Sequence, residues 1–163
     1  MEKQFVDLLN QHRGILFKVC KIYAREPPDR QDLFQEIVLQ LWRAFPTFRK
    51  QANASTWLYR VAMNTAISTY RKDIRRTSPT PFSHLAFPIP DLLEEPEPPD
   101  QVARLYVAID QLSMVEKALV LLYLEEKSYE EIASILGITR TNVGVKLSRI
   151  KTKLESLMKS VKL

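Results

Sequence analysis

Cysteine, histidine and glycine are all scarce in this chain of 163 residues, and each scarcity excludes a class of structure. The single cysteine, Cys20, cannot form an intramolecular disulfide, and two isolated histidines leave no spacing that suits a zinc ion. Cys20 lies among Leu16, Val19 and Tyr23, so we expect a small buried hydrophobe rather than a redox sensor. With three glycines and little alternation of β-branched and polar residues, helical periods dominate and no sheet is predicted.

Long apolar runs are absent as well. No run reaches the ~18 residues of a membrane span, and the polar N-terminus lacks the apolar core of a signal peptide. No cluster of carboxylates, metal-ligand set or activated nucleophile stands out, so we expect neither an enzyme nor a bound cofactor or metal. The predicted protein is cytoplasmic and is not inserted in a membrane.

The net charge of +5 conceals three segments of different composition. Residues 1–78 hold 14 Lys/Arg against 7 Asp/Glu, residues 79–100 hold 5 acids and no base, and residues 101–163 hold 10 bases against 7 acids. The middle segment contains seven prolines, which exclude a regular helix, yet it is too apolar for a pure spacer, so we expect it to lie against a partner. The predicted fold is all-α: two small helical domains, 1–78 and 101–163, joined by an extended acidic, Pro-rich linker over 79–100.

A helix-turn-helix is predicted over residues 128–154 of the C-terminal domain. Ser128 and Glu131 have the spacing of a capping box, in which each side chain satisfies a free backbone N–H of the other residue. Gly137 can end the first helix because a residue without Cβ enters the left-handed conformation at little cost. Thr139 can cap a second helix with one apolar stripe at steps of three and four: Val143, Leu147, Ile150, Leu154, Leu157 and Val161.

The other face of this second helix has the composition of a DNA-reading surface. It carries Arg140, Thr141, Val145, Ser148, Arg149 and Thr152. Arginine, threonine and serine outside an apolar stripe are typical of a helix in the major groove, where Val145 could meet a thymine methyl. Lys146 and Lys151 flank the face on opposite sides and are expected to hold phosphates. An ordinary helical hairpin with a solvated polar face is the competing interpretation, and the turn residues and basic flank favour DNA.

Three helices are predicted in the N-terminal domain. The first runs over 5–23, the second begins at a cap on Asp29 and stops at Pro46, and the third begins at a cap on Ser55 and runs to about Arg75. One face of the third helix gathers Trp57, Arg60, Asn64, Ser68, Arg71 and Arg75, with Lys72 nearby. An aromatic ring followed by stacked Arg and Asn suits single-stranded nucleic acid; the alternative is that the Trp57 ring belongs to the core.

Three motifs in this order resemble bacterial sigma factors of the extracytoplasmic-function (ECF) group. The stretch 32–36 (DLFQE), followed by Trp42 and the Phe45/Phe48 pair, looks like the family's polymerase-binding helix. The stretch 55–64 (STWLYRVAMN) looks like its promoter-melting helix, and 128–154 resembles its reader of the -35 element. The resemblance implies that the N-terminal module binds a coiled coil of the polymerase's largest subunit and recognises the -10 element as a single strand. It also implies that the C-terminal module binds the -35 element as duplex.

The resemblance further implies site residues and partners. The polymerase-binding set is Asp32, Leu33, Gln35, Glu36 and Trp42. The -10 set is Phe48, Lys50, Asn53, Trp57, Arg60, Asn64, Arg71, Lys72 and Arg75, and the -35 set is Arg140, Thr141, Gly144, Val145, Lys146, Ser148, Arg149 and Lys151. The implied partners are core RNA polymerase, promoter DNA and an anti-sigma factor. Two positions depart from the family pattern: Lys50-Gln51 replaces a frequent Gly-Glu pair, and Gly144 replaces a long polar residue.

Two other functions compete with this prediction. A duplex-DNA-binding helix-turn-helix regulator with an N-terminal dimerisation or sensing domain would bind a palindromic site, but it explains the face from Trp57 to Arg75 poorly. An enzyme acting on nucleic acid needs a carboxylate cluster or a metal set. The acidic pairs here are explained by secondary structure instead: Glu125-Glu126 lies at a predicted helix end, and Glu130-Glu131 lies at a predicted helix start.

Overall fold

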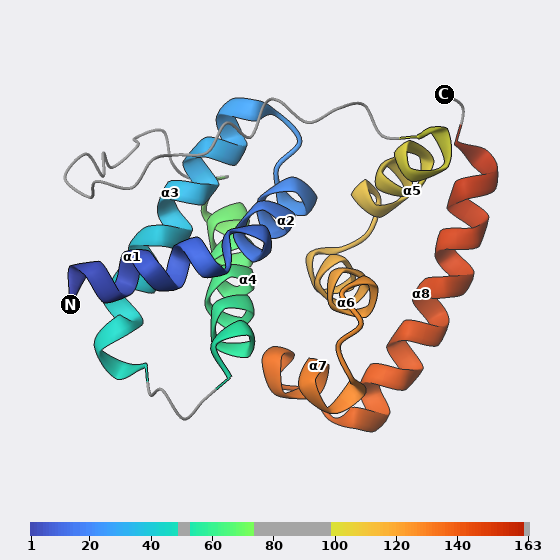
Figure 1. The fold of residues 1–163 in the computed structure, drawn as a ribbon. Coiled ribbons are helices and arrows are strands. Elements are labelled where there is room, and N and C mark those ends of the chain that lie inside the picture. The colour runs from blue at the N-terminus through green and yellow to red at the C-terminus, as the bar shows by residue number, and fades with distance from the viewer. Residues whose placement is uncertain (49–52, 74–98, 162–163) are drawn as a thin grey trace. The chain divides into compact units, whose positions relative to one another are not determined.

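The structure is a computed structural model that describes residues 1–48, 53–73 and 99–161, with 70–73 described through the backbone alone (Figure 1). All regular elements in these ranges are helices, which confirms the predicted all-α fold. The chain divides into two compact units, Met1–Glu94 and Glu95–Leu163. The predicted linker falls almost wholly outside the described residues.

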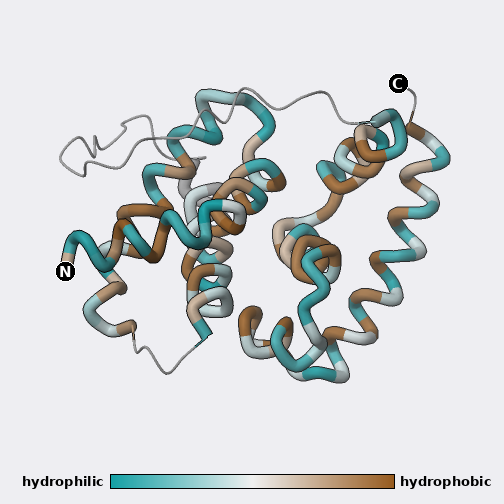
Figure 2. The backbone as a smooth tube through the Cα atoms, in the orientation of Figure 1, coloured by the Kyte–Doolittle hydropathy of each residue, from teal (hydrophilic) through white to brown (hydrophobic). Residues whose placement is uncertain are grey.

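The first unit is a bundle in which α2 (Arg13–Tyr23), α3 (Pro27–Ala44) and α4 (Ala54–Asp73) pack against one another. They follow α1 (Glu2–Gln11), and α3 runs into a short 3₁₀ helix, η1 (Phe45–Thr47). Hydrophobic and hydrophilic residues alternate along the helices, as Figure 2 shows for α1. The apolar faces bury Leu9, Leu16, Val19, Ile37, Leu41, Leu58 and Ala62 completely.

Cys20 lies in this core, as expected. Its side chain is fully buried, and desolvation raises the pKa of the thiol to about 12, against a smaller opposing effect of Arg30. The thiol therefore stays protonated at neutral pH and packs as a small apolar group.

The structure corrects the prediction of one first helix over 5–23. The chain forms two helices that meet at His12, whose φ of −122° and ψ of 29° leave the helical region. The His12 N–H bonds to the carbonyl of Leu9, three residues back, which closes α1 with a tighter turn. Asn10 and Gly14 are both weak helix formers on either side of the break, so little helical free energy is lost there.

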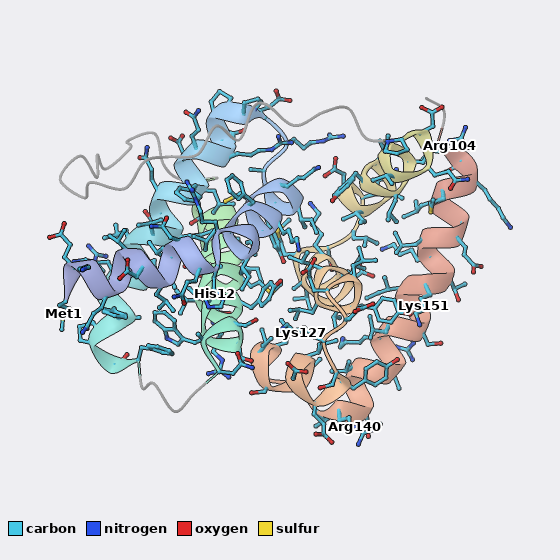
Figure 3. All side chains as sticks on the ribbon, in the orientation of Figure 1. Met1, His12, Arg104, Lys127, Arg140 and Lys151 are labelled. Atoms are coloured by element: carbon cyan, nitrogen blue, oxygen red, sulfur yellow. The ribbon has the colours of Figure 1, made fainter. Side chains whose placement is uncertain are left out.

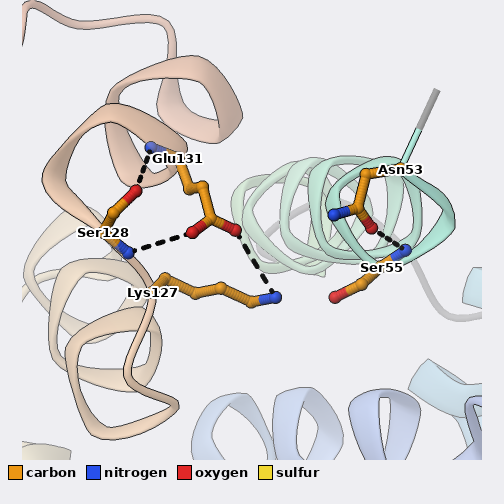
Figure 4. Close-up of polar contacts among 5 residues, drawn as sticks. All are labelled: Asn53, Ser55, Lys127, Ser128 and Glu131. Atoms are coloured by element: carbon orange, nitrogen blue, oxygen red, sulfur yellow. Dashed lines mark hydrogen bonds and ion pairs between the residues drawn. The ribbon is translucent and has the colours of Figure 1, made fainter.

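Two predicted caps were also wrong. The helix α3 begins at Pro27, two residues before Asp29, because proline is well suited to the first turn, where its missing N–H has no helical partner. Asp29 lies within that first turn. The helix α4 begins at Ala54, and the Asn53 side chain accepts a hydrogen bond of 3.0 Å from the Ser55 N–H (Figure 4). Asn53 therefore caps this helix in place of Ser55.

In the second unit, three short helices pack against one long helix. The short helices are α5 (Asp100–Asp110), α6 (Met114–Leu124) and α7 (Tyr129–Leu136), and each contacts α8 (Arg140–Ser160). The stripe predicted for α8 is its inner face, with Val143, Leu147 and Ile150 buried. None of the helices in the described ranges is long and apolar enough to cross a membrane.

Candidate nucleic-acid interfaces

The helix-turn-helix is fixed by side-chain caps at the places that the sequence predicts. The Ser128 hydroxyl accepts a hydrogen bond of 3.1 Å from the Glu131 N–H, and the Glu131 carboxylate accepts one of 3.2 Å from the Ser128 N–H (Figure 4). Gly137 ends α7 with a φ of +71°. The Thr139 hydroxyl then accepts a bond of 3.1 Å from the Asn142 N–H and starts α8. These contacts fix the turn between α7 and α8, and so the direction of α8 relative to α7.

The predicted reading face of α8 is exposed. Arg140, Thr141, Val145, Ser148, Arg149 and Thr152 all reach solvent. Val145 is 43% exposed, and Arg140 projects at the start of the helix (Figure 3). An Arg140 Nη atom lies 3.3 Å from a Glu130 carboxylate oxygen. The face has the donors, acceptors and apolar contact that base edges in a major groove require.

Gly144 faces a neighbouring helix. A Cβ placed on this glycine would lie 3.5 Å from the ring of Tyr129, the first residue of α7. This is ordinary van der Waals contact, so the Tyr129 ring occupies the space next to the glycine. The expectation that Gly144 belongs to the DNA-contacting set takes no account of this ring, because nothing in the local pattern links residues 129 and 144.

Replacing Gly144 with Ala should stabilise the second unit by about 0.5–1 kcal/mol, since alanine restricts the unfolded chain and the new methyl group fits against Tyr129. Both tryptophans, Trp42 and Trp57, belong to the first unit. The denaturation midpoint followed by circular dichroism should therefore rise, whereas the midpoint followed by tryptophan fluorescence should not change. A lower midpoint would mean that the Tyr129 ring cannot accommodate the methyl group.

The lysines of α8 have different surroundings. The Lys153 ammonium lies 3.1 Å from a carboxylate oxygen of Glu116, and Lys146 is half-buried. The Lys151 ammonium lies over the ring of Tyr123, 4.3 Å from its centroid. The sequence did not predict either partner, because both come from α6, a helix whose contacts with α8 are not encoded in the periodicity of α8.

Two capping boxes should make the second unit sensitive to acid. Hydrogen bonds from the Ser113 and Ser128 backbone N–H groups lower the pKa values of Glu116 and Glu131 below the usual 4.5. A carboxylate whose pKa is lowered by folding stabilises the protein above its unfolded pKa, and this stability is lost as the pH falls through the folded pKa.

We therefore expect the midpoint followed by circular dichroism to be constant near neutral pH and to fall below about pH 4.5. Replacing Glu116 and Glu131 with Gln should flatten this fall, because amides do not titrate. Glu155→Gln, on the exposed side of α8, is the control that should leave the pH profile unchanged. An equally steep fall in the double variant would assign the acid sensitivity to other groups.

In the first unit, Trp57 and Phe48 form an aromatic pair beside the start of α4. Their ring centroids are 4.6 Å apart, and both side chains are half-exposed. Phe48 also stacks with Phe45 at 6.4 Å, and Phe45 meets Phe5 at 5.3 Å. Trp57 thus packs against Phe48 and is only half-buried, and its contact with DNA stays a prediction.

The rest of the predicted -10 face is described only in part. Arg60 and Asn64 are exposed on α4, opposite the buried Leu58 and Ala62. Asn53 caps the helix and is itself exposed. The side chains of Arg71 and Lys72 are not described, and Lys50 and Arg75 lie outside the described residues.

The predicted polymerase-binding set divides into exposed and packed members. Asp32 is exposed, Gln35 and Glu36 are half-exposed, and Gln40 donates a hydrogen bond of 3.0 Å to the Glu36 carboxylate. Leu33 is buried, and the Trp42 ring meets Phe5 edge-on at 5.0 Å. The accessible part of this set is therefore the polar group of α3. No group of His, Cys, Asp or Glu within the described ranges could hold a metal ion.

The fold and the exposed face of α8 define an all-helical DNA-binding protein of the helix-turn-helix class, with a separate helical unit before it. Residues 8–76 match sigma-70 region 2, and residues 103–154 match sigma-70 region 4. The chain belongs to the sigma-70 family of RNA polymerase sigma factors, within the ECF group. The predicted resemblance is confirmed.

Several curated relatives support this assignment. The RNA polymerase sigma-H factor of Pseudomonas aeruginosa is 30% identical, over 98% of this chain and 88% of its own length. The ECF sigma factor SigX of Bacillus subtilis is 24% identical, over 88% and 77%. SigG of Mycobacterium tuberculosis is 28% identical over 91% of this chain, but this chain spans only 47%, about half, of the length of SigG.

Solved structures share the fold. The sigma factor RpoE of Bartonella quintana, in complex with the anti-sigma factor NepR, superposes with a TM-score of 0.71 at 19% identity, over 98% of this chain and 99% of its own. CnrH, in complex with the cytosolic domain of CnrY, gives a TM-score of 0.68 at 19% identity, over 99% and 92%. The family is one of non-enzymatic transcription initiation factors.

Proposed function

We propose that this chain directs core RNA polymerase to specific promoters and helps to open them, without chemistry of its own. The observation that carries the proposal is the exposed Arg, Thr, Ser and Val face of α8, presented by a capped helix-turn-helix within the region 4 match. A subunit with this role acts where the chromosome and the polymerase are, in the cytoplasm.

We infer a division of labour between the two units. In the second unit, the face of α8 binds the -35 element as duplex, and Lys146 and Lys151 hold phosphates beside it. In the first unit, α3 binds core polymerase and the face that begins at Trp57 binds the -10 element as a single strand. The domain limits 1–78, 79–100 and 101–163 remain a proposal of the same kind.

An anti-sigma factor is a further proposed partner. The related folds include RpoE in complex with the anti-sigma factor NepR and CnrH in complex with the cytosolic domain of CnrY. Because the fold of the whole chain superposes on both proteins, we propose that an anti-sigma factor also binds this one.

Transcription in vitro tests the proposed function. A bacterial core RNA polymerase would be incubated with fragmented genomic DNA, with and without this chain, and the transcripts would be sequenced. Start sites that depend on the chain and share -35 and -10 elements are the expected result. A chain that binds palindromic duplex DNA as a dimer without polymerase, and yields no dependent start sites, would instead be a conventional regulator.

Replacing Arg149 with Ala should cost about 1–3 kcal/mol at one base pair of the -35 element and relax the preference there. Arg149 is exposed on the reading face, where a guanidinium can form two hydrogen bonds to a guanine edge. Transcription from a panel of single-base -35 variants measures the preference. Lys159→Ala removes the same charge from the last turn of α8 and is the matched control. An unchanged preference profile for the Arg149 variant would show that this residue does not read bases.

A further inference from the structure

A cluster of two tyrosines, one lysine and one glycine lies along one flank of the reading face. Tyr123 lies in the last turn of α6, Tyr129 begins α7, and Gly144 and Lys151 are two turns apart on α8. Tyr123 is 41% exposed and Tyr129 is 36% exposed, so both rings reach solvent. Three helices thus contribute to one accessible surface, which we call the tyrosine–lysine cluster (Tyr123, Tyr129 and Lys151).

The Lys151 ammonium is held by aromatic groups. It lies 4.3 Å from the centroid of the Tyr123 ring, where the negative face of the ring attracts a cation. A hydrogen bond with the Tyr123 side chain raises the pKa of Lys151, and the nearby Tyr129 adds to the increase. The Tyr123 ring therefore positions the Lys151 ammonium, which is charged at neutral pH as an exposed lysine is.

Two other cations of α8 pair with carboxylates, whereas Lys151 is held against a tyrosine ring. Arg140 pairs with Glu130 at 3.3 Å, and Lys153 pairs with Glu116 at 3.1 Å. The contacts of Lys151 within the described ranges are with tyrosines, which carry no charge at neutral pH. Its positive charge therefore remains available for an anion from outside the protein.

Gly144 leaves the cluster open. A Cβ at this position would lie 3.5 Å from the Tyr129 ring, so the ring rests close to the α8 backbone. A long side chain at residue 144 would compete with Tyr129 for this space and would cover the path to Lys151 from the N-terminal side of α8. The absence of a side chain at Gly144 therefore leaves room for the Tyr129 ring and keeps Lys151 accessible.

We propose that Tyr123, Tyr129 and Lys151 bind one phosphate group of the promoter duplex, beside the bases that α8 reads. Lys151 supplies the charge, and each tyrosine hydroxyl can donate a hydrogen bond to a phosphate oxygen. Tyr123 is also a positioning residue, because it fixes the Lys151 ammonium. The inference rests on the proposed function, and it adds two residues from α6 and α7 to the expected phosphate contact of Lys151.

The location of the cluster favours a phosphodiester over other anions. In helix-turn-helix complexes the second helix enters the major groove and the first helix crosses the backbone. The cluster lies where the first helix, α7, meets the flank of α8. A phosphate bound there would fix the register of α8 without reading sequence.

Neutralising phosphates one at a time tests the proposal. The polymerase holoenzyme containing the full chain would be bound to a promoter duplex found by transcript sequencing, with single methylphosphonates placed across the -35 region. A methylphosphonate at one position should weaken the binding of wild type. The same methylphosphonate should not weaken the binding of Lys151→Gln. Lys151→Gln should also lower the salt slope by roughly one, so that a fourfold rise in salt costs about fourfold less affinity than in wild type.

Two conservative variants test the tyrosines. Tyr123→Phe and Tyr129→Phe keep the rings but lose the hydroxyls, and each should weaken binding about two- to tenfold, the effect of one hydrogen bond. Each should also reduce the effect of the same methylphosphonate. Lys153→Gln removes an equal charge from α8 but breaks an ion pair with Glu116, so it should retain the wild-type methylphosphonate pattern.

The outcomes separate the inference from the function on which it rests. If the holoenzyme selects its promoter but Lys151→Gln loses affinity at the same methylphosphonate positions as wild type, the phosphate site is wrong and the function stands. If Tyr123→Phe and Tyr129→Phe both behave as wild type, Lys151 acts without the tyrosines and the cluster is wrong. If no promoter is selected at all, the proposed function fails and the inference fails with it.

Discussion

Replacing Asp32, Gln35 and Glu36 together with Ala should weaken the binding of core polymerase by more than about tenfold. These side chains form the accessible polar group of α3, whose opposite side is buried in the core of the first unit. Carboxylate and amide oxygens suit a basic partner helix, and truncation of charged groups at the centre of an interface removes most of their favourable contacts. The loss should therefore be large although no apolar contact is changed.

Competition for core enzyme against a labelled sigma factor measures this effect, with circular dichroism as the test of folding. Glu2, Gln4 and Asp7 provide a matched control, because they are likewise two acids and one glutamine, all exposed on one helix of the same unit. The control triple variant should compete as wild type does. An Asp32/Gln35/Glu36 variant that competes fully would place the docking site elsewhere on the chain.

Replacing Trp57 with Ala should reduce promoter opening about five- to 150-fold, because base stacking on an aromatic ring contributes ~1–3 kcal/mol. The ring is half-exposed and is supported by Phe48 at a centroid distance of 4.6 Å, so it is held in place to receive a base. Trp57→Phe should retain much of the activity, because it keeps a ring that can stack.

Permanganate footprinting of duplex promoter DNA should show the loss, whereas binding to pre-opened DNA should be affected less. Asn10→Ala, at an exposed position of α1 in the same unit, is the control for a substitution outside the predicted -10 face. If the Trp57→Ala chain loses helical content at working temperature, the ring is primarily a core residue. The core role would then account for the defect without any contact with DNA.

The helix-turn-helix could be predicted in detail because its signals are local. The capping box of Ser128 and Glu131, the left-handed Gly137 and the cap at Thr139 each depend on residues within three or four positions of one another. The apolar stripe of α8 likewise follows from the helical period alone. Family resemblance gave the order of the two functional regions, and the comparisons confirm it.

The contacts that the sequence did not predict join residues that are separated by at least one turn or loop. Tyr129 against Gly144, Tyr123 against Lys151 and Phe48 against Trp57 depend on how helices pack, which periodicity does not specify. The errors at His12, Asp29 and Ser55 concern helix ends, where several nearby residues could each satisfy the free backbone groups. Packing and the fixed φ of proline decided between them.

In the proposed complex, the ion pair of Arg140 and Glu130 competes with DNA for the Arg140 side chain. Both side chains are largely exposed, so the pair contributes little to stability, on the order of 0–1 kcal/mol. The Glu130 carboxylate nevertheless occupies Arg140, so a DNA phosphate has to displace it in order to bind Arg140. The same carboxylate also repels that phosphate. Only a base edge that offers two well-aligned acceptors compensates for the exchange fully. A weak surface contact of this kind would disfavour random sequence more than the promoter, and so sharpen discrimination during the search along the chromosome.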